Sequence, residues 1–416
     1  MEHCTYTSQR IHLREILVLM LLAMLAGSQT HASEFRLFGS IGSESHLTPA
    51  NPKSPLNPGN FLGIPTASNS SDLVLFGEAI PGDKSWKFHF KLRGEGEWRR
   101  SFSSRAEVSE LYGSISVTPW LDLLAGRKIE KWGTGYAWNP TGVVNPAKNP
   151  SDPNDRRAAF RGVDMVGAEL FVKGWNVSLL AVPQLDWQRQ SGRLLAGAGW
   201  AARAYKLVGD VDLSFTFSGG SGLPNHQGVS FARVLGNALE LHGELARFQD
   251  NLQPVARDGA WQLQRRSSTE LLLGAQYTFP RNVNLIAEYF HSGTGLSSKD
   301  WNQFRDDVRE SQRALESGNA FPLVQQNRQF APLRMGQDYS FVRASWPIRL
   351  NKLEAELMVI TSLRDGSSII RPGITWKVHP NWSLYWLQSQ FAGGAGTEFG
   401  HLQVKRSSDF GLRFSF

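Results

Sequence analysis

Cysteine is almost absent from this sequence, whose one cysteine, Cys4, lies close to the N-terminus. If the N-terminal segment is removed, the remaining chain has no thiol and cannot hold a disulfide or a cysteine-bound metal or cluster. The ten histidines are scattered and do not show the spacing of zinc ligands. We therefore expect no cofactor and no metal site.

Long apolar runs are also absent beyond the N-terminus. Arg10 and Arg14 precede an apolar run at 16–26, which is too short to cross a bilayer, and Thr30 and Ala32 suit positions −3 and −1 of a cleavage site. We predict a signal peptide at 1–32. Downstream there is no run of about 20 apolar residues, which excludes a bundle of membrane-spanning helices.

Charge is sparse as well: only 19% of the residues are charged, and the formal net charge is +7. A nucleic-acid-binding protein concentrates its positive charge in a patch or along a helix. Here the basic residues are spread among many segments. The sequence therefore indicates no nucleic-acid partner, and its basic balance leans weakly toward anionic solutes.

Strict alternation of apolar and polar residues is what the sequence has instead. Four apolar residues in 211–217 alternate with polar ones, and 86–93 and 239–246 repeat the pattern. Successive side chains of a strand point to opposite faces, so each such segment presents one apolar wall and one polar wall. The pattern predicts β-strands, in either a soluble sandwich or a membrane barrel.

The connections between these segments favour the barrel. Tight turns such as 81–84, 208–210 and 379–381 alternate with longer connections, notably at 42–70, 131–162, 248–267 and 292–336. Short turns at one end and long loops at the other are typical of bacterial outer-membrane barrels. Aromatic residues beside the short turns would form a girdle at the periplasmic membrane surface: Trp86, Trp120, Trp175, Phe279, Trp346 and Trp382.

We predict one transmembrane antiparallel β-barrel over 33–416, all-β, with about 18 strands, short periplasmic turns and long outer loops. Sixteen strands, with the N-terminal segment disordered or plugging the barrel, is the alternative. The predicted strands are 34–41, 71–80, 85–96, 106–117, 121–130, 163–172, 175–184, 194–206, 211–219, 227–235, 238–247, 268–279, 283–291, 337–346, 352–363, 368–378, 382–392 and 401–416. A barrel of this width is too wide for side chains to fill, so it would enclose an aqueous lumen.

The polar positions of the strands should line that lumen. The predicted pore-lining residues are Lys87, His89, Lys91, Arg93, Arg203, Arg233, Glu240, Glu244, Arg343, Glu354 and Arg371. Because basic and acidic groups fall largely on different strands, they could set up a transverse field that acts on passing ions. The alternative is that these charges only pair with one another and stiffen the wall.

The third outer loop, at about 131–162, is the most distinctive stretch. Its repeated Asn-Pro and Asp-Pro steps disfavour helix and ladder, so it should be extended but stiff. If it folds inward, it would bring charged residues to a constriction and offer aromatic faces to sugar rings; otherwise its aromatics pack on the barrel rim. The candidate constriction residues are Trp132, Tyr136, Trp138, Asp152, Asp155, Arg156, Arg157 and Arg161.

A strand ending in Gly126-Arg127, followed by a long third loop, resembles the bacterial porins, and the strand count and basic balance are similar to alginate-export and substrate-specific porin barrels. The resemblance covers the whole chain in architecture but only two motifs, Gly126-Arg127 and the C-terminal strand. It implies a loop that folds inward and narrows a pore.

Two other segments bear on function. The loop near 292–336 contains apolar residues spaced as on one face of a short helix, beginning at Ser298, which predicts a lid over the mouth or a solvated helix at the rim. His291 and Ser292 raise the question of a lipid hydrolase. Adjacent strand residues point to opposite faces, which is unsuitable for a proton relay, so we expect no catalytic residues and no enzyme.

The C-terminal strand indicates the cellular location. Phe410, Leu412, Phe414 and Phe416 alternate with polar residues and resemble the signal that the barrel assembly machinery recognises. We therefore expect a protein of the Gram-negative outer membrane, embedded in lipid and oligomeric or monomeric. Its expected function is a channel for diffusion or export of small polar, anionic or carbohydrate-like solutes. The alternatives are a scaffold barrel around an exported polymer, a secreted protein or an electron carrier, and, less favoured, a lipid hydrolase.

Overall fold

The computed structural model describes residues 34–82, 85–146, 148–183, 197–257, 260–329, 335–348 and 352–416. The predicted signal peptide at 1–32 lies outside this range. No helix in the described part of the chain is both long enough and apolar enough to cross a membrane.

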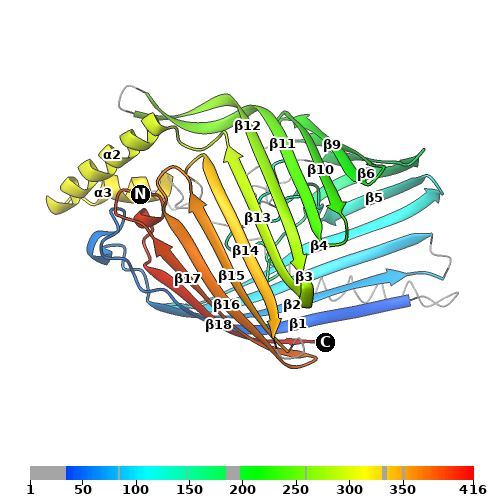
Figure 1. Cartoon of the computed structure of the whole chain (residues 1–416), viewed down its shortest axis with the longest axis horizontal. Coiled ribbons are helices and arrows are strands. Elements are labelled where there is room, and N and C mark those ends of the chain that lie inside the picture. The colour runs from blue at the N-terminus through cyan, green and yellow to red at the C-terminus, as the bar shows by residue number, and fades with distance from the viewer. Residues whose placement is uncertain are drawn as a thin grey trace.

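Eighteen antiparallel strands close into a barrel (Figure 1). Each strand pairs with its neighbours in sequence, and β1 pairs with both β2 and β18. The strands are β1 Glu34–Leu47, β2 Ala67–Ile80, β3 Trp86–Trp98, β4 Phe102–Thr118, β5 Leu121–Lys128, β6 Val163–Val172, β7 Trp175–Val182, β8 Gly199–Val208, β9 Val211–Gly220, β10 His226–Leu235, β11 Leu239–Arg257, β12 Ala260–Phe279, β13 Val283–Ser292, β14 Asp338–Ile348, β15 Leu353–Ser362, β16 Ser368–His379, β17 Trp382–Ala392 and β18 Arg406–Ser415. The predicted 18-strand barrel is confirmed, and the 16-strand alternative is wrong.

The barrel closes where the first strand meets the end of the chain. Gly39 and Phe416 exchange two backbone hydrogen bonds, each with an N···O distance of 3.0 Å. A Cβ atom on Gly39 would lie 2.4 Å from the Phe416 ring, so only glycine lets this ring lie flat over β1. β1 is therefore a full member of the wall, and it is longer than the 34–41 predicted from the sequence.

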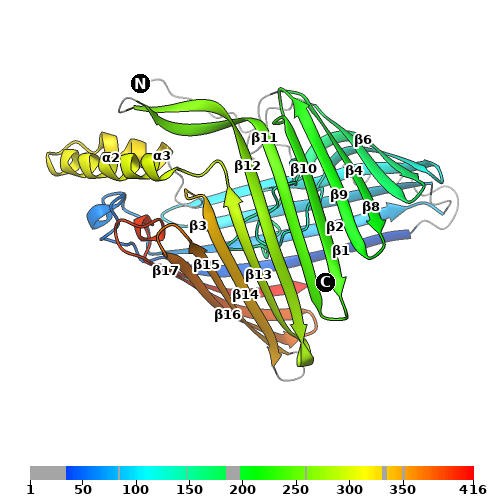
Figure 2. The same cartoon turned by 45° about the horizontal axis from the view of Figure 1, so that its top comes forward.

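The two ends of the barrel differ (Figures 1 and 2). Tight turns join β2 to β3, β4 to β5 and the following pairs at one end, while α2 (Ser298–Glu316) and α3 (Phe321–Gln329) lie at the other. The predicted long loop at 248–267 is wrong, because β11 and β12 continue through it and are joined between Arg257 and Ala260. A hairpin that extends into water needs no apolar outer face, so this part of it lacks the alternation used to find strands.

Outward positions of the strands are apolar and exposed. Leu241 and Leu245 on β11 and Leu273 on β12 are examples, and their exposure on an otherwise closed sheet is what a lipid-facing surface requires. Of the aromatic residues beside the short turns, Trp86 and Trp120 are 44% and 50% exposed.

The predicted helix near residue 298 is present as α2. Ser297 caps it by accepting a hydrogen bond from the backbone N–H of Asp300 at 3.2 Å. Trp301, Phe304 and Val308 are buried in an apolar cluster that also contains Leu56 of the β1–β2 connection and Leu323 of α3. One face of α2 is therefore packed against neighbouring outer loops rather than solvated.

Candidate functional site

The segment between β5 and β6, residues 129–162, lies inside the barrel, and we call it the inward loop. It bonds to the carboxylates of Glu244 on β11, Glu288 on β13, Glu356 on β15 and Glu44 on β1. These strands lie far around the ring from β5 and β6, so the loop has to cross the lumen to reach them. Glu356 is only three residues from the short-turn end of β15, which places the contact deep in the barrel.

Two buried carboxylates hold the first half of the inward loop, which we define as 129–146. Glu244 accepts hydrogen bonds from the backbone N–H groups of Thr134 (2.6 Å), Gly135 (2.6 Å) and Thr141 (2.9 Å), and from the Thr141 hydroxyl (2.6 Å). Carboxylates that accept several N–H bonds in a buried setting form strong, directional contacts. The second carboxylate is Glu288.

Glu288 continues this pattern on the next stretch of the loop. It accepts the backbone N–H groups of Tyr136 and Ala137, the latter at 2.8 Å, and lies 2.9 Å from His242 Nε2. The two glutamates therefore accept hydrogen bonds from five backbone N–H groups of the loop, at 134–137 and 141, which have no backbone partner on a strand in the described part of the chain. An irregular backbone crossing the lumen is stable only because the wall supplies these acceptors.

Apolar packing fixes the same half of the loop on both sides. Trp132, Val143 and Val144 join a cluster with wall residues of β6, β7 and β11, including Met165. Trp138 packs in a second cluster, stacked on Phe290 of β13 with ring centroids 4.8 Å apart. The first half thus fills part of the lumen as a small hydrophobic core.

The second half of the inward loop, 148–162, is polar. Asp155 and Ala158 have positive φ angles of 45° and 50°, and the Asp155 carboxylate accepts the N–H groups of Ala159 at 2.6 Å and Phe160 at 3.0 Å. Burial raises the pKa of Asp155, although these two N–H groups favour its charged form. The result is a tight turn around two consecutive arginines.

The two arginines reach opposite parts of the wall. Arg156 bonds to Glu356 on β15, and Arg157 donates to Glu44 on β1 at 2.6 Å and contacts His46. Arg157 thereby places its cation beside a cluster of three side chains, Glu44, His46 and Asp409. One nitrogen or oxygen atom from each of them lies within 4.8 Å of the other two.

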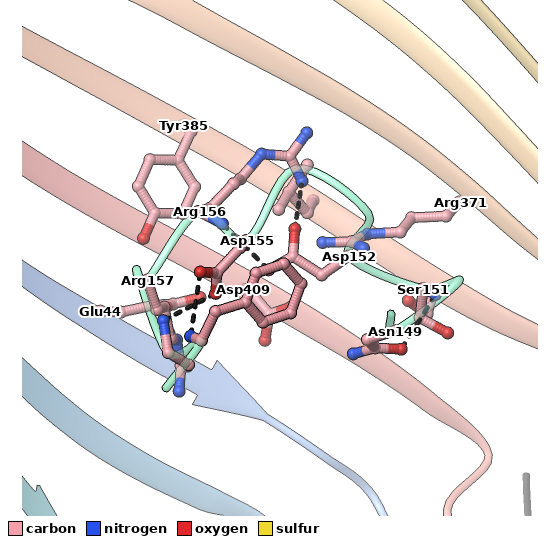
Figure 3. A pocket seen from close by; sticks show the side chains of 14 residues that line it. Glu44, Asn149, Ser151, Asp152, Asp155, Arg156, Arg157, Arg371, Tyr385 and Asp409 are labelled. Carbon is pink, nitrogen blue, oxygen red and sulfur yellow. Dashed lines mark hydrogen bonds and ion pairs between the residues drawn. The ribbon is translucent and has the colours of Figure 1, made fainter. Parts of the chain in front are cut away.

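A cavity of about 340 Å³ lies between this second half and the wall formed by β1, β16, β17 and β18 (Figure 3). Its charged lining comprises three arginines and four carboxylates. These are Arg156, Arg157, Arg371, Glu44, Asp152, Asp155 and Asp409. The cavity is therefore strongly polar and of mixed sign.

Several predicted pore-lining residues contact the inward loop or its anchors. Arg93 is 3% exposed and donates to the Arg157 carbonyl at 3.0 Å, and Arg343 donates to Glu356 at 3.0 Å and lies over the Tyr136 ring. Glu244 lies beneath the loop with 2% exposure. For these residues the loop, not open solvent, is the nearest neighbour in the lumen.

In the described part of the chain, the other predicted wall residues form no hydrogen bond or ion pair with the inward loop. His89 is stacked on Tyr112 with ring centroids 4.7 Å apart, Arg203 donates to Ser214 at 2.8 Å, and Arg233 pairs with Asp210 at 2.8 Å near the short turns. The carboxylate of Glu240 lies 3.5 Å from His242 and that of Glu354 lies 3.8 Å from Arg343. Lys87 and Lys91 alternate along β3 with outward aromatic residues.

The predicted constriction residues separate into two groups. Asp152, Asp155, Arg156 and Arg157 line the cavity, whereas Arg161 does not. The expectation that the tryptophans offer stacking faces to sugars is wrong, because Trp132 and Trp138 are each 2% exposed and packed against the wall.

Sequence reasoning placed Glu244 in the lumen but missed Glu44 and part of the cavity. Glu44 lies in the segment 42–70, which was predicted as a long connection, so alternation did not assign it to the wall that faces Arg157. Tyr385 and Asp409, on β17 and β18, also line the cavity. Their inward alternation was a usable signal, but nothing in the sequence indicated which inward residues the loop would reach.

The side chains of His291 and Ser292 bond to different partners and do not form a relay. His291 Nδ1 lies 2.8 Å from Asp338, whereas the Ser292 hydroxyl lies 2.9 Å from that of Thr294. The terminal strand has Phe410, Leu412 and Phe416 exposed at 48%, 40% and 47%. Phe414, between them in the alternation, packs on the Trp382 ring at 4.8 Å.

No protein-family model matches the sequence, and no characterised protein matches it in sequence. Among solved structures, OccK11 (OpdR) of Pseudomonas aeruginosa is similar, with a TM-score of 0.57, 10% identity and coverage of 92% of this chain and 96% of that one. A Rhodopseudomonas blastica porin triple mutant gives a TM-score of 0.46 at 10% identity, covering 92% and 100%. Salmonella typhi OmpF in complex with daunomycin gives 0.45 at 10% identity, covering 92% and 97%. On the likeness to OccK11, the chain has the fold of a porin-type β-barrel.

Proposed function

We propose that this protein is an outer-membrane channel through which small polar solutes diffuse, with the inward loop as its constriction. The observation that carries the proposal is a long loop fixed inside a closed 18-strand barrel, with a charged cavity beside it. A barrel of this size leaves a lumen that its own side chains do not fill. A loop that narrows such a lumen turns a wide opening into a selective one.

The charges on the cavity suggest which solutes pass. The chain as a whole has more basic than acidic residues, but the cavity combines three arginines with four carboxylates, so its lining offers charges of both signs. The burial of Trp132 and Trp138 removes the main reason to favour sugars. Charged or zwitterionic small solutes are therefore better candidates than neutral carbohydrates.

The proposal includes a route to the membrane. Residues 1–32 would direct export and be removed, and the terminal strand with Phe410, Leu412, Phe414 and Phe416 would be read by the barrel assembly machinery. The exposed apolar outer wall suits insertion into lipid. We place the mature protein in the outer membrane of a Gram-negative bacterium.

Reconstitution into planar lipid bilayers tests the function. The purified, folded barrel should give stepwise increases in conductance in potassium chloride, and the reversal potential across a salt gradient should report its ion preference. A matched preparation that has been heat-unfolded serves as the control. A folded barrel that inserts into the bilayer yet conducts nothing would rule out the channel.

A further inference from the structure

We propose that the cavity between the inward loop and β16–β18 binds a small zwitterion, a molecule with one carboxylate and one ammonium group such as an α-amino acid. This inference rests on the proposed function, because it names the class of solute that would pause at the constriction. It derives from the two charged groups of the cavity that the protein leaves without a full set of partners.

Arg371 is the first of these groups. It lies on β16, is 7% exposed, and its Nε atom has no hydrogen-bond partner among the described residues. Figure 3 shows its guanidinium reaching from the wall into the cavity. A buried cation without a bonded acceptor is costly, and a ligand carboxylate would satisfy it through paired N–H bonds.

The neighbouring arginines differ from Arg371 in this respect. Arg156 pairs with Glu356, and Arg157 pairs with Glu44 at 2.6 Å. The wall beside Arg371 is also locally irregular, because the β16–β17 ladder omits Arg371 and Pro372. Proline has no N–H to donate to the ladder, which accounts for the gap on the β17 side, while Arg371 and Pro372 remain paired with β15.

Asp152 is the second group. Its Oδ2 atom accepts a hydrogen bond from the backbone N–H of Arg156 at 3.2 Å. Its buried Oδ1 atom has no hydrogen bond in the part of the chain that the structure describes. The nearest guanidinium nitrogen, on Arg156, is 3.7 Å from it. An ammonium group would supply the missing donor.

The remaining carboxylates of the cavity are already engaged. Glu44 is bonded to Arg157, Asp409 lies 2.9 Å from His46, and Asp155 accepts two backbone N–H groups. They nevertheless add negative charge, so a simple anion would be repelled by the lining as a whole. A simple cation would leave Arg371 without a hydrogen-bond acceptor. A zwitterion supplies a carboxylate to Arg371 and an ammonium group to Asp152.

The rest of the lining suits a small solute of this kind. Phe160 and Leu387 provide apolar surface, and Ser151 and Ser389 provide hydroxyl groups. The volume of about 340 Å³ is at the lower end of the range found for small-molecule sites. Binding should be weak, because a channel must release what it takes up.

Three probes that share an isobutyl group separate the charge classes: leucine, 4-methylpentanoate, which lacks the ammonium group, and 3-methylbutylamine, which lacks the carboxylate. Saturation-transfer NMR on the purified, folded barrel in detergent measures weak binding without relying on conductance. Leucine should bind, and each analogue should bind about tenfold more weakly, since it loses one charged contact.

Two variants assign the contacts. R371Q should lower the affinity for leucine about tenfold, to that of the unaltered protein for 3-methylbutylamine. D152N should lower it to the affinity of the unaltered protein for 4-methylpentanoate. R309Q, on the outer helix α2, is the matched control and should leave all three affinities unchanged. Circular dichroism and heat-dependent gel mobility would verify that each variant is folded.

The possible results separate this inference from the channel itself. Equal binding of leucine and 4-methylpentanoate, leucine binding that is insensitive to R371Q, or no detectable binding would each overturn the zwitterion site. None of these results depends on potassium chloride conductance. A conducting barrel without leucine binding would keep the channel and reject the site, and leucine binding without conductance would do the reverse.

Discussion

The two halves of the inward loop belong to one continuous segment but are held by different physical means. The first half, 129–146, has its backbone amides bonded to buried glutamates and its tryptophans packed into apolar clusters. The second half, 148–162, is held by arginine–carboxylate pairs beside a polar cavity. One loop thus combines a core-like support in its first half with a charged surface beside a cavity in its second half.

The largest effect is expected when the glutamate under the first half is removed. Glu244→Ala leaves three backbone N–H groups and the Thr141 hydroxyl without their acceptor. Losing several hydrogen bonds to one buried charge should lower the free energy of opening of the first half by about 4 kcal/mol. Amide hydrogen exchange at 132–145 should speed up, and single-channel conductance should rise as the loop leaves the lumen.

Glu240→Ala is the matched control for that change. Glu240 lies four residues before Glu244 on the same strand, its carboxylate lies near His242, and among the described residues it forms no hydrogen bond or ion pair with the loop. Its removal should leave exchange at 132–145 unchanged. If both substitutions released the loop equally, the loop would be held by the overall negative charge of the wall and not by the hydrogen bonds that Glu244 accepts.

A smaller loss is expected from the apolar support of the same half. Trp138 is 2% exposed and packs against Phe290, Tyr339 and Phe341. Trp138→Ala should cost about 3 kcal/mol of local stability, because it opens a cavity in a packed cluster. Hydrogen exchange should accelerate around residue 138, whereas Trp98→Ala on the exposed rim should have no such effect; equal behaviour of the two variants would contradict a core-like first half.

The second half should respond mainly in selectivity. Arg157→Gln removes one positive charge from the cavity and leaves Glu44, which is 7% exposed, without its guanidinium. We expect a shift of the reversal potential toward cations and a local destabilisation of about 2 kcal/mol. Exchange at 132–145 should change little. A large acceleration there would show that the two halves form one cooperative unit.

The sequence was enough to predict the strands of this barrel but not which wall residues hold the inward loop. Alternation along 211–217 and similar segments identifies strands because lipid on one side and water on the other impose a period of two. The extension of β11 to Arg257 escaped detection because its sequence lacks strict alternation: it packs beside α2, where the Ala256 N–H donates to Asp300 and Val255 is 8% exposed. Glu244 was identified as an inward residue, but its partners are backbone amides of the loop, and amides carry no signature in the sequence.

The same reasoning explains the error about the tryptophans. Trp132 and Trp138 lie in a loop rich in proline and asparagine, which suggests exposure, and no periodic pattern marks their apolar neighbours on the wall. Their burial depends on wall residues such as Phe248 of β11 and Phe290 of β13, which lie far from the loop in sequence. Contacts between an irregular loop and a distant wall are set by tertiary geometry and cannot be found by periodicity.

The smallest predicted effect tests how the two halves are linked. The Tyr136 hydroxyl donates to Asn154 at 2.9 Å, and Lys148 donates to the Gly135 carbonyl, so each half supplies one side chain to the other. Burial raises the pKa of Tyr136 and lowers that of Lys148, so Tyr136 remains a donor at neutral pH. Tyr136→Phe removes only the hydroxyl and should cost about 0.5–1 kcal/mol.

Since the Tyr136 ring would remain beneath Arg343, the seat of the first half should persist, and exchange at 132–145 should stay slow. The change should appear instead as faster exchange at 152–157 and as increased current noise, because the second half loses one tie to its rigid neighbour. Tyr277→Phe, on the lipid-facing side of β12, controls for the loss of a hydroxyl elsewhere. Unchanged exchange and noise in Tyr136→Phe would show that Arg156 and Arg157 alone position the charged half, and that the packed half only fills space.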